Sequence, residues 1–513
     1  MSEPSSDCVE AAPVGLVGVG AALPSGRLAV ADVAAGWDLT GGRGQLAVCG
    51  PDEDSLTLAW SAAGRALAAA GVEAGEVGGL WWGTARPPMA EGPSLAFLVA
   101  AVGLGTSSGG LLAGGSVHAG MDALVAAWDA VAAGSVATAL VIASDALVPG
   151  PGTGAEKSSG AGAVALVLSG RPAGARLVAR ATRVRPLLDR YRGDGQAGTG
   201  DPYDPRLYRE RELIPSVASA ATALGDRVPA GTRWSVPDPD GRLGKAVAKA
   251  VRAEAVASEG VFARVGDTGS AAPFLGALAA LAAPGPVCMV GTGGGRSTAV
   301  LLEVRSPVPG ADLALTALDG GSRGTRPVTY ASVLRSRGQL VPLADPVPMG
   351  VPPGSAAFVR GSEELLSLEG RRCSACGTIA VPPSIHPVCI ACGNDSGELV
   401  HLARSGTVQT FVVNHTMPPP FEAPLPIAVV DLDDGSRVML QGMPEDAVAL
   451  AIGDRVDLEL RRYALERGVP VYGFKVSRRI DQNGGPPGGS ANGANGAAAS
   501  APSGLTGARK ERS

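Results

Sequence analysis

The sequence has few aromatic residues, only four histidines and no surplus of basic charge. Aromatic side chains make up 4% of its 513 residues, so a folded core must come from small aliphatic side chains that pack closely. Its 43 basic residues are outnumbered by 48 acidic ones, which argues against a protein that neutralises nucleic-acid phosphates. Hydrophobic residues make up 45% of the chain, which excludes a wholly disordered polypeptide and, at this length, predicts about two to four domains.

Neither the N-terminal residues nor the hydrophobic runs carry a signal for export or membrane insertion. Residues 1–13 are polar and hold acidic but no basic side chains, unlike a secretory signal peptide. No apolar run reaches the roughly 18 residues of a membrane span without a charge or a Pro-Gly break. We therefore expect a cytoplasmic protein without membrane contact, and we expect residues 1–13 to be disordered.

Strand and helix patterns alternate through the first two thirds of the chain. Short apolar runs are typical of buried strands, and segments with apolar residues at helical spacing lie between them. The expected strands are 14–24, 79–83, 137–143, 163–168, 286–290 and 297–304, and the expected helices are 55–70, 120–134, 244–257 and 273–283. This alternation predicts an α/β sheet covered on both faces, and its recurrence indicates an internal duplication.

The composition changes after residue 304. A proline-rich stretch at 343–356 predicts a linker, and a helical pattern follows at 356–370. Closely spaced strands with turn signals then favour a small barrel. These strands are expected at 406–414, 427–432, 437–441 and 455–460. From residue 479 to 513 the chain holds almost no bulky apolar side chain, which predicts a disordered tail.

Four of the seven cysteines form two Cys-x-x-Cys pairs within twenty residues. The pairs are Cys373 with Cys376 and Cys389 with Cys392, and a glycine follows each pair where a tight turn is needed. In a large chain without an export signal, this spacing favours a metal site over disulfides or four free thiols. Four thiolates complete a tetrahedron, so the site predicts a structural zinc ion and leaves no place for His386 as a ligand.

The cysteine region resembles the zinc-ribbon and OB-fold family called domain of unknown function 35. The resemblance covers about 357–478 and is carried by Arg371-Arg-Cys-Ser-Ala-Cys-Gly-Thr378, Pro382-Pro383, Cys389-Ile-Ala-Cys-Gly393, Gly406-Thr-Val-Gln-Thr-Phe411 and the prolines at 418–420. It implies a helix and zinc ribbon over 357–400 and an OB-fold barrel over 401–478. Members accompany thiolase-type enzymes and are associated with acyl-CoA. An OB-fold can instead bind single-stranded nucleic acid, but residues 371–478 hold ten basic and twelve acidic side chains, which disfavours that alternative.

Residues 14–342 resemble the thiolase superfamily, and within it the 3-hydroxy-3-methylglutaryl-CoA synthase branch. The motifs are Val17-Gly-Val-Gly-Ala-Ala-Leu-Pro24, Gly50-Pro-Asp-Glu-Asp54, Asp189-Arg-Tyr-Arg-Gly-Asp-Gly195, Val265-Gly-Asp-Thr-Gly-Ser270 and Thr329-Tyr-Ala-Ser-Val-Leu-Arg-Ser-Arg-Gly338. The resemblance implies a five-layer fold of two βαβαβαββ halves, about 14–172 and 173–342. It also implies a CoA thioester as substrate or ligand, and a homodimer that we expect to form around residues 116–143.

The catalytic positions of this superfamily are altered in the sequence. The resemblance implies a cysteine nucleophile at a helix N-terminus, a histidine, an asparagine and, in the synthase branch, a glutamate. These four positions are held by Val117, Pro237, Asp267 and Ala85, in that order. The other cysteines offer no evident replacement, because Cys8 lies in the predicted tail, Cys49 precedes a Gly-Pro loop and Cys288 lies in a buried-strand pattern.

A few polar side chains near the expected helix start are candidates for other chemistry. Ser116 is a candidate oxygen nucleophile, His118 and Asp122 share a helix face at four-residue spacing, and Asp267 is a candidate acid or base. The alternatives are a capping serine, a structural histidine and a solvated aspartate.

The glycines Gly293, Gly294 and Gly295 match the superfamily's oxyanion loop, whose donors are backbone amides and survive the loss of side chains. A tight turn between two strands is the alternative.

Three functions follow from these observations. The favoured one is a thiolase-like protein without the catalytic side chains, which binds acyl-CoA or acts as a scaffold for a thiolase-type partner enzyme. The second is an enzyme of altered mechanism, a retro-aldolase that cleaves β-hydroxyacyl-CoA. The third is an acyltransferase that forms carbon–carbon bonds, for which a cysteine at the helix start is missing.

Overall fold

The computed structural model describes residues 8–105, 107–171, 173–186, 188–201, 204–340, 362–416, 423–466 and 469–479. The predicted linker at 343–356 and, apart from residue 479, the predicted tail lie outside these residues.

The first half of the large α/β part contributes five strands to one continuous sheet. They are β1 (Cys8–Ala22), β4 (Gly79–Gly83), β5 (Gly109–Ala113), β6 (Thr138–Ala146) and β7 (Ala161–Ser169). Their order in the sheet is β1-β7-β6-β4-β5, in which β4 is parallel to β5 and β6, and β7 is antiparallel to β1 and β6. The helices α2 (Ser55–Ala70), α3 (Ser94–Val102) and α4 (Ala119–Ala132) connect these strands.

The second half repeats this topology strand by strand. Its strands are β8 (Ala175–Val184), β9 (Arg233–Ser235), β10 (Ala255–Val256), β11 (Gly285–Gly293) and β12 (Arg296–Val304). Their order is β8-β12-β11-β9-β10, with the same pattern of parallel and antiparallel neighbours. Strands β1 and β8 pair antiparallel and join the two halves. The predicted duplication is therefore confirmed.

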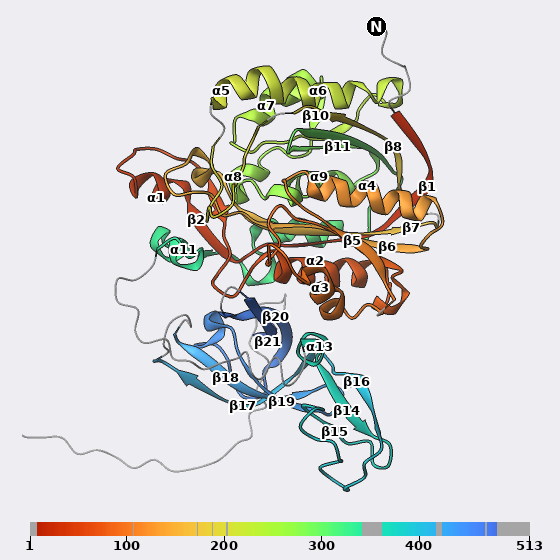
Figure 1. Cartoon of the computed structure of the whole chain (residues 1–513), viewed down its shortest axis with the longest axis vertical. Coiled ribbons are helices and arrows are strands. Elements are labelled where there is room, and N and C mark those ends of the chain that lie inside the picture. The colour runs from red at the N-terminus through yellow and green to blue at the C-terminus, as the bar shows by residue number, and fades with distance from the viewer. Residues whose placement is uncertain are drawn as a thin grey trace, which may run out of the picture. The chain divides into compact units, whose positions relative to one another are not determined.

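Helices and sheet halves form five layers. Figure 1 shows α4 and α9 (Ala272–Leu281) between the two halves of the sheet. Helices α6 (Ile214–Thr222) and α7 (Leu243–Ala250) cover one outer face, and α2 and α3 cover the other. The side chains of α9 from Pro273 to Leu278 are buried without exception, as expected for a helix enclosed on both sides. This arrangement confirms the predicted thiolase-like fold class.

Glycines allow the inner helices to lie close to the sheet. A Cβ atom at Gly83 would lie 2.3 Å from the carbonyl oxygen of Ala119, and one at Gly120 would lie 2.4 Å from that of Ser270. These distances are shorter than any ordinary contact, so the sequence needs glycine here. The few aromatic side chains suffice because close packing of small residues fills the core.

Two expectations about the large part are wrong. Strand β1 begins at Cys8, because residues 8–10 pair with Ala179–Ala181 of β8, so disorder does not extend to residue 13. Strand β6 lies inside the sheet between β7 and β4, and its main chain is paired on both sides. A second copy cannot add to this strand, so the part of the expected dimer contact that lies at 138–143 is excluded.

Shorter elements complete the large part. A second sheet has the order β13-β2-β3, with β2 at Gly26–Ala29, β3 at Gln45–Ala47 and β13 at Arg326–Pro327. Helices α1 (Val30–Ala35) and α11 (Tyr330–Ser336) are held together by Glu156, whose carboxylate accepts hydrogen bonds from Trp37 Nε1 at 2.9 Å and from the Tyr330 hydroxyl at 2.6 Å. This contact ties the end of the large part to its beginning.

The C-terminal part contains a short helix, a small ribbon and a nearly closed barrel. After α13 (Ser362–Ser367), the ribbon has the order β15-β14-β16, with β14 at Glu369–Cys373, β15 at Ile379–Ala380 and β16 at Gly397–His401. The barrel has the order β19-β18-β17-β20-β21. Its strands are β17 (Ser405–Asn414), β18 (Leu425–Leu432), β19 (Arg437–Gln441), β20 (Arg455–Glu466) and β21 (Val469–Arg478). A bridge from Gly442 to Val476 brings the two edges together, as expected for an OB-type barrel.

The loop before α2 makes several of the contacts between the barrel and the large part. Lys475 Nζ lies 2.7 Å from Asp52 Oδ2, and the Tyr472 hydroxyl donates a 2.8 Å hydrogen bond to Asp54 Oδ2. The Arg462 guanidinium donates to the carbonyl oxygen of Pro51 at 2.8 Å. The motif Gly50–Asp54 therefore has a structural use, since it holds β20 and β21 against the start of α2.

Glu53 in this loop provides a pH-dependent test of the contact. Burial raises its pKa to about 7, against a weaker lowering effect of Arg461, whose Nη2 lies 3.8 Å from Oε1. In the unfolded chain Glu53 ionises near its ordinary pKa of 4.5, so the folded state loses stability as the pH rises from about 4.5 to about 7. We expect the free energy of unfolding of Glu53→Gln, relative to the wild type, to rise by up to about 3 kcal/mol between pH 4.5 and pH 8. Urea unfolding of both proteins measures this difference, with the exposed Glu91 as the control in Glu91→Gln. A constant difference over this range would contradict the prediction.

Candidate functional site

The predicted helix start and the predicted glycine loop lie against each other. Ser116 and Val117 precede α4, and Gly293–Gly295, the glycine turn, connects β11 to β12. A Cβ atom at Gly293 would lie 2.6 Å from Val117 Cγ2, and one at Gly294 would lie 2.7 Å from Ser116 Cβ. Gly294 and Gly295 also have φ angles of +58° and +72°, which favour glycine. The structure thus brings together two segments about 175 residues apart in the sequence.

One backbone donor of the glycine turn already has a partner. The Gly294 amide donates a 2.7 Å hydrogen bond to Asp189 Oδ2. Burial is the main effect on Asp189 and raises its pKa, although this hydrogen bond and the neighbouring Arg190 oppose the shift. The carboxylate of Asp189 therefore accepts the hydrogen bond that this amide would otherwise donate to the oxyanion of a reacting thioester. Asp189 lies in a motif that carries the family resemblance, but no pattern in the sequence indicates this contact.

His118 is held on both sides of its ring and is 1% exposed. Its Nε2 lies 2.9 Å from Thr298 Oγ1, which in turn lies 2.9 Å from Thr182 Oγ1. Its Nδ1 lies 3.1 Å from Asp122 Oδ2, at an angle that gives no hydrogen bond, and Asp122 Oδ1 lies 2.5 Å from Arg296 Nη1. The predicted pair at four-residue spacing thus meets in space. Because the histidine is enclosed, these contacts support a structural function for it.

Asp267 is bound to an arginine rather than free to act as a base. Its Oδ2 lies 2.7 Å from Arg190 Nη2, and its Oδ1 accepts a hydrogen bond from the Gly269 amide at 3.0 Å. Both oxygens of the carboxylate therefore have partners within the protein. At the other two positions that the family resemblance compares with catalytic residues, Ala85 donates its amide to Asp145 Oδ1 at 2.8 Å, and Pro237 is buried just after β9.

Asp145, at the end of β6, is a buried carboxylate that the sequence analysis did not single out. Its Oδ1 accepts from Thr84 Oγ1 at 2.9 Å and from the Ala85 amide, and its Oδ2 accepts from the Ser270 amide at 2.7 Å. Burial raises the pKa of Asp145, and these hydrogen bonds oppose the shift. The side chain connects the loop at 84–86 with the loop at 268–270. Its only sequence signal is an acidic residue inside an otherwise apolar strand.

Neither of the cysteines of the large part whose side chains are described lies at the start of α4. Cys288 is fully buried in β11, and burial raises its pKa. Cys49 precedes the loop at 50–54, and burial raises its pKa well above the ordinary value. In both places burial disfavours the thiolate, which is the nucleophilic form of cysteine.

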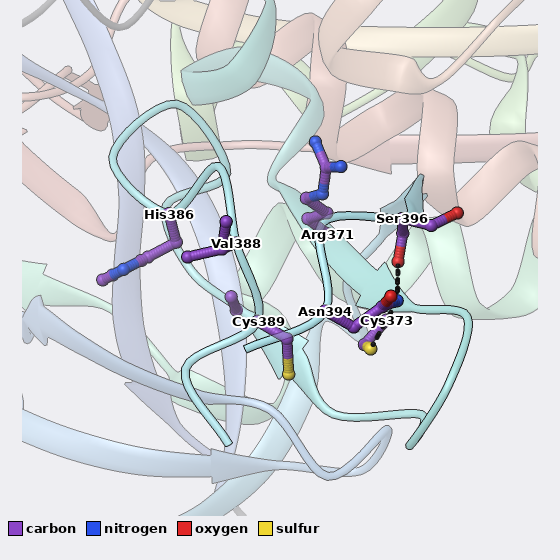
Figure 2. Close-up of a pocket in the computed structure, with 8 residues that line it drawn as sticks. Arg371, Cys373, His386, Val388, Cys389, Asn394 and Ser396 are labelled. Carbon is purple, nitrogen blue, oxygen red and sulfur yellow. Dashed lines mark hydrogen bonds between the residues drawn. The ribbon is translucent and has the colours of Figure 1, made fainter. Parts of the chain in front are cut away.

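The four ribbon cysteines form a metal-binding geometry. Their Sγ atoms lie within 4.8 Å of one another, with Cys373 and Cys392 3.7 Å apart and Cys376 and Cys389 3.5 Å apart. Tetrahedral thiolates at about 2.3 Å from a zinc ion would be about 3.8 Å apart, so the donor set fits zinc. Figure 2 shows the His386 side chain directed away from the sulfur atoms of Cys373 and Cys389. This agrees with a site made of four sulfurs.

The backbone prepares the thiolates for a cation. Gly377 and Gly393 adopt φ angles of +73° and +74°, and each returns its amide to the carbonyl oxygen of the first cysteine of its pair. The amides of Ala375 and Ala391 donate to Cys373 Sγ and Cys389 Sγ at 3.4 Å each. Hydrogen bonds to Cys373, the largest from the Cys376 amide, lower its pKa to about 6. Amides directed at sulfur stabilise the charge that a metal ligand needs.

Both parts of the chain are similar to known proteins. Residues 399–461 match the family model described as ChsH2, C-terminal OB-fold domain. The hydroxymethylglutaryl-CoA synthase of Pyrobaculum arsenaticum is 31% identical over 207 residues, which are 38% of this chain and 59% of that protein. The corresponding synthase of Pyrobaculum neutrophilum is 27% identical over 343 residues, 63% of this chain and 97% of that protein.

Solved structures show the same fold. MvaS in complex with 3-hydroxy-3-methylglutaryl coenzyme A matches with a TM-score of 0.53 and 19% identity, over 65% of this chain and 93% of that one. The 3-oxoacyl-(acyl carrier protein) synthase III of Pseudomonas aeruginosa PAO1 matches with a TM-score of 0.50 and 21% identity, over 58% of this chain and 100% of that one.

The large part of the chain has a thiolase-like fold. Its large part is homologous to the hydroxymethylglutaryl-CoA synthases, and its C-terminal part carries an OB-fold domain and a cysteine cluster suited to zinc. None of the helices in the described part of the chain has the length and apolar character that crossing a bilayer requires.

Proposed function

We propose that this chain binds acyl-CoA without forming an acyl-enzyme, as a binding or scaffold partner of a thiolase-type enzyme. One observation carries the proposal: the residue that lies against the glycine turn at the start of α4 is Val117. A hydrocarbon side chain at this position has no atom that can accept an acyl group. Homology to synthases that act on CoA thioesters supports acyl-CoA as the ligand class.

The polar side chains around Val117 also support a binding function. His118 is enclosed between Thr298 and Asp122, and Asp267 is paired with Arg190. His118 Nε2 and both carboxylate oxygens of Asp267 are therefore held by protein groups. The chain is also proposed to form a homodimer through a surface other than β6. Light scattering measures the mass of the particle and distinguishes a dimer from a monomer.

The ribbon completes the proposal as a structural zinc module. Four thiolates leave no open position for water or substrate, so the ion stabilises the fold and performs no chemistry. The ion thereby keeps the ribbon folded, so that the ribbon and the barrel can contact the acyl-CoA ligand or the partner enzyme.

One observation favours a retro-aldol reaction as the second candidate. The Asp189 carboxylate is 2.7 Å from the Gly294 amide, beside the position at which an acyl group would lie. In such a reaction a carboxylate accepts the proton of the β-hydroxyl group, the Cα–Cβ bond breaks to give a carbonyl compound, and a proton returns to Cα of the acyl-CoA. An acyl-enzyme is not needed. A carbon–carbon-forming acyltransferase has less support, because it does need one.

Incubation with radiolabelled acetyl-CoA, followed by acid precipitation and peptide mapping, tests the proposal. We expect binding of acetyl-CoA but no stable label between residues 80 and 300. If a label appears, the variants Ser116→Ala and Cys49→Ser show which side chain carries it. Loss of the label in either variant would overturn the proposal. Cleavage of a β-hydroxyacyl-CoA that Asp189→Asn abolishes would favour the second candidate, whereas activation of a thiolase-type enzyme by this chain would support the scaffold function.

A further inference from the structure

Arg86 and Arg192 bond to one loop near Ala85, and Arg190 lies in the segment that leads to this loop. Arg86 follows Ala85, and its Nη1 donates to the carbonyl oxygen of Ala197 at 2.8 Å. Arg192 Nη1 donates to the carbonyl oxygen of Gln196 at 3.4 Å. Because these two carbonyl groups are neighbours in the chain, both guanidinium groups lie on the same loop. The third arginine, Arg190, extends from this segment to Asp267.

The guanidinium of Arg190 is incompletely satisfied. Its Nη2 pairs with Asp267 at 2.7 Å, whereas its buried Nη1 has no hydrogen-bond partner among the described residues. A buried donor without an acceptor is costly, and such groups commonly mark the place of a water molecule or ligand. Arg190 Nη1 can therefore donate a hydrogen bond to a further acceptor.

Positive charge exceeds negative charge in this cluster. Within the described residues, Asp267 forms an ion pair with Arg190, while Arg86 and Arg192 bond to carbonyl groups and to no carboxylate. Asp189 is directed to the Gly294 amide instead, and Asp194 lies exposed on the loop. Burial, followed by repulsion from Arg192, lowers the pKa of Arg86. Both effects would be relieved by a bound anion.

Asp145 and Asp267 join the loop that carries Arg86 to the loop at 268–270. Asp145 bonds the amides of Ala85 and Ser270, and Asp267 bonds the amide of Gly269. The loops that carry Arg86 and Asp267 are thereby fixed to each other.

We propose that Arg86, Arg190 and Arg192 form an anion-binding subsite for a carboxylate or phosphate group of the ligand. Planar guanidinium groups match the geometry of both anions and bind them through paired hydrogen bonds. The inference rests on the proposed function in one respect, because an acyl-CoA ligand offers two sources of such an anion. One source is the phosphate groups of CoA, and the other is a second carboxylate on the acyl group.

Malonate and inorganic phosphate test the subsite without CoA. At constant ionic strength, with chloride as the reference, we expect either anion to raise the melting temperature of the wild type. We expect this increase to be lost in Arg86→Gln and in Arg192→Gln, and to persist in the control Arg176→Gln, whose arginine pairs with Glu303 on the surface. Equal stabilisation of all four proteins, or stabilisation of none, would overturn the inference. Arg190→Gln is a secondary variant, since it leaves Asp267 unpaired and can lose stability for that reason alone.

Calorimetric titration with thioesters identifies the source of the anion. If the acyl carboxylate binds here, the wild type prefers malonyl-CoA over acetyl-CoA, and Arg86→Gln weakens malonyl-CoA binding about tenfold or more while acetyl-CoA binding is unchanged. If a CoA phosphate binds here, Arg86→Gln weakens both CoA thioesters equally and leaves S-acetylpantetheine unaffected. Unchanged binding of every ligand in Arg86→Gln would overturn the subsite. A wild type that binds the free anions but no thioester would overturn the proposed function and leave the subsite supported.

Discussion

Replacing Cys389 by serine is expected to remove the metal ion and to unfold the ribbon. The four Sγ atoms lie within 4.8 Å of one another, so the loss of one thiolate leaves three ligands, with like charges close together. The ribbon has only three short strands and little core of its own, and structural zinc contributes roughly 10–16 kcal/mol to the folding of comparable small domains. Metal analysis should find one zinc ion per chain in the wild type and less than half an equivalent in Cys389→Ser.

The matched control is Cys49→Ser, which changes a cysteine of the large part and should keep its zinc. Protease digestion of Cys389→Ser should cut the ribbon first, and chelation of the wild type should give the same fragments. Zinc content in Cys389→Ser equal to that of the wild type would contradict the assignment. A well-folded wild type without zinc would contradict it as well.

Replacing Asp145 by alanine should lower the free energy of unfolding of the large part by roughly 3–5 kcal/mol. The substitution removes the acceptor of the buried Thr84 hydroxyl, of the half-buried Ala85 amide and of the buried Ser270 amide. Each buried donor without a partner costs about 1–3 kcal/mol. Urea unfolding monitored by tryptophan fluorescence measures the change, since Trp82 lies on the neighbouring strand β4.

Two further variants separate the hydrogen bonds of Asp145 from its charge. Asp145→Asn keeps one acceptor oxygen and should cost less than alanine does. Asp129→Ala removes an exposed carboxylate that pairs with Arg180, and such surface pairs contribute about 0–1 kcal/mol. If Asp145→Ala and Asp129→Ala had equal effects, Asp145 would not be the connection between the loops at 84–86 and 268–270.

These two experiments test two separate parts of the proposed function. The zinc experiment tests whether the ribbon is a structural module, and the Asp145 experiment tests what fixes the loops beside Val117. The proposed anion subsite depends on the second result, because Arg86 lies on the loop at 84–86 and Asp267, the partner of Arg190, directly precedes the loop at 268–270. A weakened Asp145 connection should therefore also weaken anion binding.

Patterns that are local in the sequence predicted local structure well. The helix expected at 55–70 has these bounds in the structure, since its apolar side chains repeat at helical spacing and Asp54 caps its start. The strands expected at 79–83 and 437–441 also keep their bounds. The helix expected at 244–257 ends at Ala250, however, and the barrel strand at 469–478 was not expected. The two Cys-x-x-Cys pairs predicted the sulfur cluster, because each pair closes through its own tight turn.

The sequence by itself determined the duplicated α/β order, the ribbon cysteines and the absence of a thiol at the start of α4. Those features follow from spacing along the chain, which periodicity and turn residues specify directly. Only the tertiary structure decided that Asp189 bonds the glycine turn, that Asp267 pairs with Arg190 and that the loop at 50–54 holds the barrel. These contacts join residues about 75 to 420 positions apart. Their partners are set by how sheet and helices pack, which no local pattern of residues encodes.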